Sequence, residues 1–163
     1  MPAHIYEPCQ EMKEIIKDLF EKRKDLFGDM IEFIFPEMIS CAIRTDKPSP
    51  PSKTEVLNIK GIKGPYTTVT DKKYIIYGYR DAWERCSYEK KVAHVANMLR
   101  RIEYPTQEEI NELSEKGKDY EYGKTKTPDI HDFKTFIDAF GSDWSSVDKD
   151  TIPNLLDNTD III

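Results

Sequence analysis

Residues 73–102 read KYIIYGYRDAWERCSYEKKVAHVANMLRRI, and within this stretch the hydrophobic pattern changes from that of a strand to that of a helix. The first part, residues 73–79, is almost continuously apolar and aromatic, which predicts a β-strand. Ser87 then offers a helix N-cap. After it, apolar residues recur at helical spacing and predict a helix over residues 88–102, which Pro105 ends.

The apolar residues of this central helix fall on one side of it. They form a stripe about 100° wide, as expected of a helix that packs one face on a core and exposes the other. His94 lies roughly opposite the stripe, so we expect its side chain to face solvent or to line a groove. The stripe consists of Val92, Val95, Ala96, Leu99 and Ile102.

Two further helices are predicted, one near each end of the chain. Residues 9–27 carry apolar side chains at steps of three, four and seven, and Gly28 follows as a helix-ending residue. Residues 131–140 place three phenylalanines and an isoleucine on one side and stop at Gly141. Both patterns are typical of helices that pack on a core.

The segment between the first two helices is rich in β-forming residues. Three prolines make residues 47–52 a loop, because proline donates no hydrogen bond and fixes its φ angle. The fold class that follows is α+β, with a small, mostly antiparallel sheet of three or four strands packed by the N-terminal and central helices. Strands are predicted at residues 30–35, 39–45, 56–61 and 73–79.

The remaining part of the chain is more polar. Residues 106–127 are highly charged and predict an exposed excursion with one short solvent-facing helix. The end of the chain has no clear period, and its Ile161–Ile163 run is expected to add a strand or to dock on the body. We therefore expect a single domain over residues 1–145 and a C-terminal tail over residues 146–163.

The composition of the chain argues against several classes of protein. The chain has 163 residues, 30 acidic against 24 basic side chains and a net charge of -6, which disfavours a surface built to hold nucleic acid. The first ten residues lack a signal-peptide pattern, and no apolar run approaches the roughly 20 residues of a membrane span. Cys9, Cys41 and Cys86 are odd in number and lack a CxxC spacing, so reduced thiols in a cytoplasmic protein are expected.

Few residues in the chain could carry catalysis, because there are only three histidines and no common catalytic motif. A zinc-binding helix needs a second histidine four residues after the first and a glutamate base directly after it. After His94 these positions hold Met98 and Val95. The simplest interpretation is therefore a groove without catalytic residues or metal, lined by Asn97, Met98, Arg101 and Tyr77.

Two alternatives remain open at this point. His94, His131 and either Asp129 or Asp132 would form a chemically sensible mixed zinc site, although an aspartate at the start of a helix also serves as its cap. Lysines and arginines on the central helix could instead contact nucleic acid. The basic residues concerned are Lys90, Lys91, Arg100 and Arg101, with Lys53, Lys60 and Lys63 in the strand region.

The order of these elements resembles the putative phage metallopeptidase family of compact, zincin-like domains. The resemblance covers residues 5–145 and rests on the strand 73–79, Trp83, the helix 88–102 and two short segments. These segments are TPDIHDF at residues 127–133 and FGSDW at residues 140–144.

The resemblance implies that the central helix once carried the HExxH motif. His94 then matches the first histidine, whereas Val95 and Met98 replace the glutamate and the second histidine. Asp129, His131 or Asp132 would match a downstream ligand. Loss of a general base alone costs about 10²- to 10⁴-fold in rate.

We therefore expect a metallopeptidase-like protein that has lost catalysis, carries no cofactor and binds a host or phage protein in the cytoplasm, without membrane or nucleic-acid contact. The alternative is an active zinc-dependent hydrolase with rearranged ligands.

Overall fold

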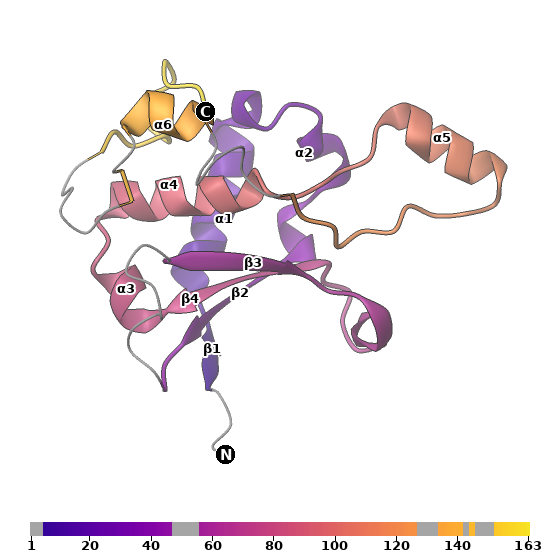
Figure 1. Ribbon diagram of the computed structural model, residues 1–163, viewed down its shortest axis with the longest axis horizontal. Coiled ribbons are helices and arrows are strands. Elements are labelled where there is room, and N and C mark those ends of the chain that lie inside the picture. Colours follow the sequence, from indigo (N-terminus) through magenta and orange to yellow (C-terminus); the bar gives the residue numbers. More distant parts are fainter. Residues whose placement is uncertain (1–4, 47–55, 127–133, 142–143, 146–151) are drawn as a thin grey trace.

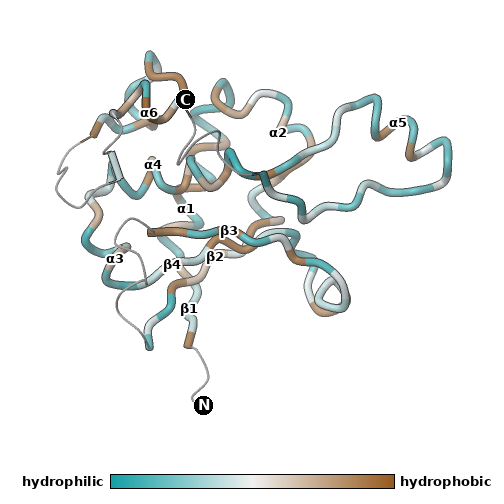
Figure 2. Tube along the Cα trace, viewed as in Figure 1, coloured by the Kyte–Doolittle hydropathy of each residue, from teal (hydrophilic) through white to brown (hydrophobic). Residues whose placement is uncertain are grey.

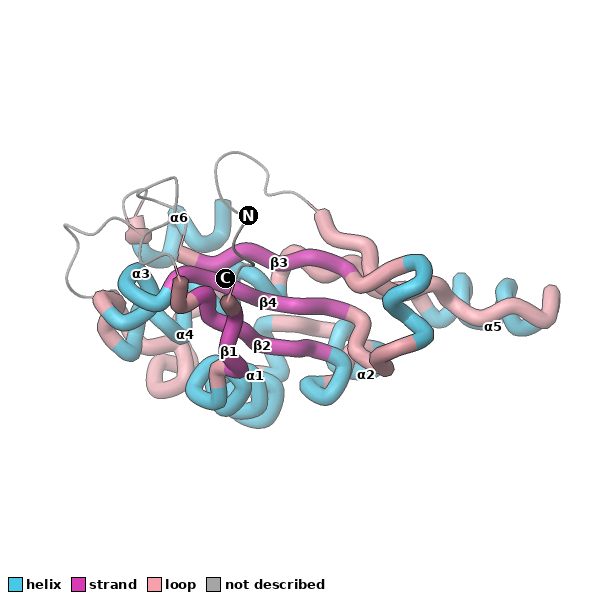
Figure 3. Tube along the Cα trace, turned by 90° about the horizontal axis from the view of Figure 1, so that it is seen from below, coloured by secondary structure: helices cyan, strands magenta, loops and turns pink. Residues whose placement is uncertain are grey.

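A computed structural model describes residues 5–46, 56–126, 134–141, 144–145 and 152–163. In chain order the elements, with short 3₁₀ turns labelled η, are β1 Tyr6–Pro8, α1 Gln10–Lys22, η1 Lys24–Leu26, α2 Met30–Phe33, η2 Pro36–Met38, β2 Ile39–Arg44, β3 Leu57–Gly61, η3 Gly64–Thr68, β4 Tyr74–Tyr79, α3 Arg80–Glu84, α4 Tyr88–Leu99, α5 Gln107–Glu115 and α6 Lys134–Phe140. The helices α1 and α4 lie against one face of a single sheet, and α5 projects away from it (Figures 1 and 3). The α+β class is confirmed.

The sheet has four strands in the order β1-β2-β4-β3. Its two outer pairs, β1 with β2 and β3 with β4, are antiparallel, as the sequence predicts for most of the sheet. The central pair is parallel, with Ile39 opposite Tyr74 and Arg44 opposite Tyr79. The sheet is therefore mixed.

Alternation along β4 decides which side of the sheet is buried. Tyr74, Ile76 and Gly78 are buried, and the residues between them are half-buried. The helices α1 and α4 lie over the buried face (Figures 1 and 3). The core thus lies between this face and the two helices, as expected from the apolar patterns of residues 9–27 and 88–102.

Two predicted elements differ from the structure. Residues 30–35 do not form a strand: α2 covers Met30–Phe33 and Ile34 follows it. The buried side chains here are Met30 and Ile34, four residues apart, a spacing that fits one helical turn rather than a strand. The helix predicted over residues 9–27 ends at Lys22, because Arg23 leaves the helical conformation and a short 3₁₀ turn follows.

The C-terminal segment docks on the body, one of the two outcomes expected for it. Ile152, Leu155, Leu156 and Ile163 are buried in the same core as α1 and α4. The buried guanidinium of Arg23 donates to the carbonyl oxygens of this segment. The boundary at residue 145 between a domain and a tail stays a prediction.

Candidate functional site

The central helix α4 is fixed at its start by three separate interactions. Ser87 caps it by accepting a hydrogen bond from the backbone N–H of Lys90. Glu11 of α1 accepts hydrogen bonds from Lys91 Nζ at 2.8 Å and from Trp83 Nε1 at 3.1 Å. Lys91 also lies 5.2 Å from the centre of the Trp83 ring. One carboxylate therefore ties α1, α3 and α4 together.

The helix α4 is buried on all sides rather than along one stripe. Every residue from Val92 to Leu99 is buried, including Asn97. Helix α1 and strand β3 pack on α4, and α6 lies on the side away from the sheet (Figure 1). The expectation of one exposed face was therefore wrong, because elements far along the chain cover it.

His94 lies in this covered part of α4. Its side chain is 5% exposed, and its ring centre lies 4.7 Å from that of Trp144. Trp144 in turn packs against Phe136 and Phe140 of α6. Within the described part of the chain, His94 Nε2 is buried and has no hydrogen-bond partner. The expectation that this histidine faces solvent was wrong.

Burial determines the protonation state of His94. The loss of solvation, and next the positive charge of Lys90, lower the pKa of its imidazole to about 3. Lys90 lies one turn before His94 and is itself buried. The histidine is therefore neutral in the folded protein at neutral pH.

We expect this neutral histidine to make the protein sensitive to acid. Between about pH 6.5 and pH 3 the unfolded chain binds a proton here and the folded protein does not. The free energy of unfolding should therefore fall from pH 6.5 toward pH 3, by at most about 1.4 kcal/mol per pH unit. Urea unfolding of the wild type and of His94→Gln at pH 7, 6 and 5 measures the difference in slope. Parallel stability curves for the two proteins would contradict the buried placement of His94.

The four residues predicted to line a groove do not all lie on the same side of the sheet. Asn97 and Met98 are buried, and Arg101 is half-buried with its Nε 3.3 Å from Asn97 Oδ1. Tyr77 alternates with the buried residues of β4 and thus points to the face of the sheet away from α4. It contacts the ring of Tyr6 there. A binding groove at these four residues stays a prediction.

The predicted metal ligands are only partly placed. Asp129, His131 and Asp132 lie outside the described residues, so their position relative to His94 stays a prediction. Among the residues that are described, no three His, Cys, Asp or Glu side chains come close enough to hold a metal ion. The two positions that the resemblance assigns to a base and a second ligand, Val95 and Met98, are apolar and buried.

The three cysteines are free thiols, as predicted. Burial raises the pKa of Cys41 to about 12 and also raises those of Cys9 and Cys86. All three therefore stay protonated at neutral pH. This argues against a role for any of them as a nucleophile.

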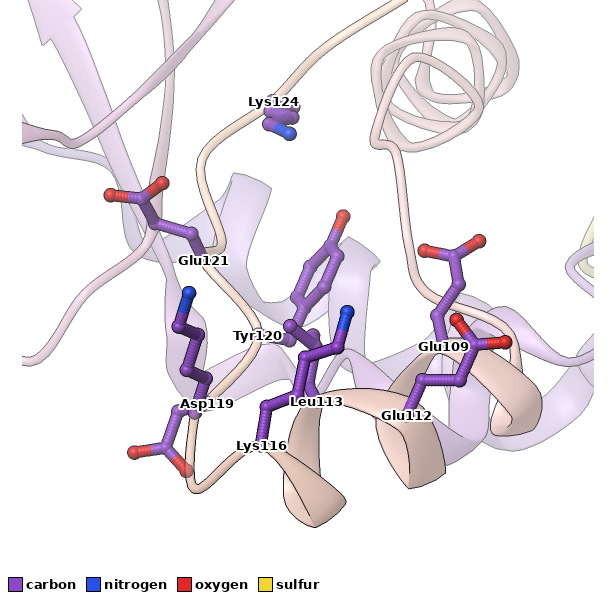
Figure 4. Close-up of a pocket in the computed structure, with 9 residues that line it drawn as sticks. Glu109, Glu112, Leu113, Lys116, Asp119, Tyr120, Glu121 and Lys124 are labelled. Carbon is purple, nitrogen blue, oxygen red and sulfur yellow. The ribbon is translucent and has the colours of Figure 1, made fainter.

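Two open clefts, of about 640 and 390 Å³, lie along α5 and the chain that returns from it, not over His94. Glu109 and Glu112 line one wall of the larger cleft, and Tyr120 lies opposite (Figure 4). The sequence indicated only an exposed excursion in this region. Its alternation of Glu with Ile110 and Leu113 was the one available signal of a partly apolar helix face.

Comparison with known proteins adds one finding to this geometry. The family model described as putative phage metallopeptidase matches residues 4–156, nearly the whole chain. The chain belongs to this family. Searches of curated proteins and of solved structures found no match.

Membership of the phage metallopeptidase family confirms the resemblance found in the sequence, and the match extends beyond residue 145 into the docked C-terminal segment. Within the described residues, none of the helices combines the length and apolar character needed to cross a bilayer.

Proposed function

We propose that this member of the phage metallopeptidase family is catalytically inactive and acts by binding another protein. The proposal rests on the two residues Val95 and Met98, which follow His94 in α4. Val95 is 0% exposed and Met98 is 4% exposed, and neither side chain can bind a metal through oxygen or nitrogen or accept a proton. A glutamate and a histidine stand at these two places in the HExxH motif.

The chemistry of peptide hydrolysis explains why this matters. In such a site a zinc ion activates a water molecule and a glutamate next to the first histidine takes its proton. The described residues do not fit a zinc ion, because they bring a single imidazole to this place and pack it on an indole ring. The positive charge of Lys90, one turn away, further opposes a second positive charge at His94.

A binding role requires no solvent-filled catalytic cleft. A scaffold that once held extended peptides can keep a protein-binding surface after it has lost its catalytic groups. The family points to a phage or its host as the source of the partner, and the cytoplasm is the compartment that we propose for the encounter. Nucleic acid has no part in this proposal, since Lys90 is buried and Lys91 is bound to Glu11.

The proposal is tested with protein purified without an affinity tag. We expect no cleavage of a fluorogenic casein substrate above buffer, and far less than one zinc per chain by elemental analysis. Added zinc should leave the melting temperature unchanged, and His94→Gln should match the wild type in all three measurements. An active zinc peptidase of the thermolysin type serves as the positive control.

One observation favours a second candidate, an active zinc-dependent hydrolase. Within the described structure His94 Nε2 is buried without a partner, which is how a ligand nitrogen awaiting a metal would look. His131 and Asp129 or Asp132 would complete that site. Near-stoichiometric zinc, lost in His94→Gln and in His131→Ala, together with casein cleavage by the wild type, would support this candidate and overturn the first.

A further inference from the structure

Residues 104–122 project from the body as an arm that contains α5 (Figure 1). From Thr106 to Glu121 no side chain is buried, and three are half-buried. Most of the arm is hydrophilic (Figure 2). The three half-buried side chains are Ile110, Leu113 and Tyr120.

The base of this α5 arm is held firmly. Backbone hydrogen bonds join Glu103 N to Lys124 O at 3.0 Å and Lys126 N to Arg101 O at 2.7 Å. The hydroxyl of Tyr74 on β4 donates to Glu103 O and accepts from the N–H of Gly123, both at 3.2 Å. The arm is therefore presented by the sheet in a fixed direction.

The α5 arm has little of its own to stabilise it. Ordering a residue costs about 1–2 kcal/mol of backbone entropy, and a helix shorter than about 12 residues is marginal in water on its own. The nine residues of α5 gain a cap from Thr106, whose hydroxyl accepts from Glu109 N, but no buried side chain. A partner that covers Ile110 and Leu113 would supply the missing burial.

The charges of the arm indicate what such a partner carries. From Thr106 to Glu115 there are four glutamates and no basic residue. Burial, followed by the negative charges of Glu103 and Glu109, raises the pKa of Tyr120. None of the ion pairs in the described structure involves a residue of the arm. The basic residues of the larger cleft, Lys116, Lys118 and Lys124, come from its far turn and returning chain.

We propose that the α5 arm docks a lysine- or arginine-rich protein segment, with an apolar side chain of that segment seated in the cleft over Leu113 and Tyr120. Its cations face Glu109 and Glu112, which lie side by side on α5 (Figure 4). This inference rests on the proposed protein-binding function and names its surface. A second copy of this acidic chain fits less well, because it would bring like charges together.

Binding is measured by fluorescence anisotropy with a short labelled peptide of alternating lysine and leucine, and with its glutamate–leucine counterpart. The wild type should bind the first peptide, and more weakly at high salt. The double variant Glu109→Lys/Glu112→Lys should bind it at least about tenfold more weakly. Glu14→Lys/Glu21→Lys on exposed positions of α1 makes the same change in net charge and should differ from the wild type by less than about twofold.

Two further variants separate docking from general charge effects. Leu113→Ala keeps the charge and should weaken binding by removing the apolar contact. Replacement of residues 106–121 by a short glycine–serine linker should abolish binding, while the melting temperature stays near that of the wild type because no buried side chain is lost. The melting temperature also shows that each variant is folded.

Each result separates this inference from the function on which it rests. Three results would overturn docking at the arm. These are equal effects of the α1 and α5 charge reversals, a preference for the glutamate peptide, and no binding of either peptide. A dimer of the wild type that the linker variant loses would do the same, since the occupant would then be a second copy. Cleavage of casein would overturn the proposed function instead, whatever the arm binds.

Discussion

Placing a glutamate at position 95 should unfold the protein or nearly so. The side chain of Val95 is 0% exposed, in a helix that is buried on all sides. An unpartnered carboxylate there would cost about 3–5 kcal/mol, a large part of the 5–15 kcal/mol that stabilises an ordinary domain. Val95→Glu places a glutamate at the second position of the HExxH spacing. We expect this glutamate to disrupt the core and to give no peptidase activity.

The effect of the carboxylate charge can be separated from that of side-chain size with Val95→Gln. Glutamine has nearly the same size and shape as glutamate but carries no charge. Glutamate in the core should have a raised pKa, so the folded protein would hold it protonated. The excess destabilisation of Val95→Glu over Val95→Gln should therefore be largest at neutral and higher pH and shrink toward pH 4. Urea unfolding of both variants at pH 8 and pH 5 measures this.

The opposite outcome would be informative about function. If the Val95→Glu protein had the same melting temperature as the wild type at neutral pH, position 95 would have to be open to water. If it also cleaved casein, the scaffold would be a peptidase that lacks only its base. The first result would contradict the burial of position 95, and the second would contradict the proposal that the protein is catalytically inactive.

The elements with strong local patterns could be predicted from the sequence. The strand at β4, the helix at α4 with its Ser87 cap and the exposed helix at α5 were all expected near their observed places. Each depends on residues close together in the chain. Periodicity and capping act over that range, which is why these predictions were confirmed.

Features that depend on distant residues could not be predicted in this way. The parallel pairing of β2 with β4 joins strands that are separated in the chain by β3. Helix α1 ends early because Arg23 turns to bond the far end of the chain. Met30 and Ile34 pack as a helical turn although the residues around them favour strands.

The same limit applies to the candidate site. The apolar stripe of α4 was visible, but the cover over its other face comes from Trp144, Phe136 and the C-terminal segment. His94 is therefore buried where a solvent-facing or groove-lining residue was expected. The residues at the two HExxH positions after His94, Val95 and Met98, could be read from the sequence because the motif lies within one helix.

Removing Arg23 should cost nearly as much stability as charging the core. The side chain of Arg23 is 0% exposed. Its Nη1 donates to the carbonyl oxygens of Leu155 at 2.5 Å and Asn158 at 2.8 Å, and its Nη2 donates to that of Ile161 at 2.6 Å. Nη2 also lies 3.5 Å from the carbonyl oxygen of Thr159. Nε and Nη2 bond Asp25, whose carboxylate is more than half exposed and contributes less.

Arg23→Leu keeps an apolar stem but leaves these carbonyl groups, of which that of Leu155 is buried, without their donors. We expect a loss of about 3–5 kcal/mol, which lowers the melting temperature of a domain of this size by about 10 °C. Arg23→Lys keeps the charge and loses the planar fork of donors, so it should fall between the wild type and Arg23→Leu.

The chain offers a matched control in Arg44, which binds Asp46 with the same two-residue spacing at 2.8 and 3.2 Å. That pair lies at the surface, where the guanidinium of Arg44 is also 5.8 Å from the centre of the Tyr79 ring. Arg44→Leu should therefore shift the melting temperature much less than Arg23→Leu. Equal shifts for the two variants would mean that the carbonyl contacts of Arg23 add nothing beyond a surface ion pair.

Hydrogen exchange shows what Arg23 holds in place. Backbone amides of residues 154–161 should exchange much faster in Arg23→Leu, because the guanidinium fixes the carbonyl groups of the same segment. Leu155 and Ile163 belong to the same core as the buried residues of α1. The backbone amides of α1 should therefore also lose protection from hydrogen exchange. Unchanged exchange in α1 would make the segment a separable tail; a joint loss would make it part of the folding unit of the domain.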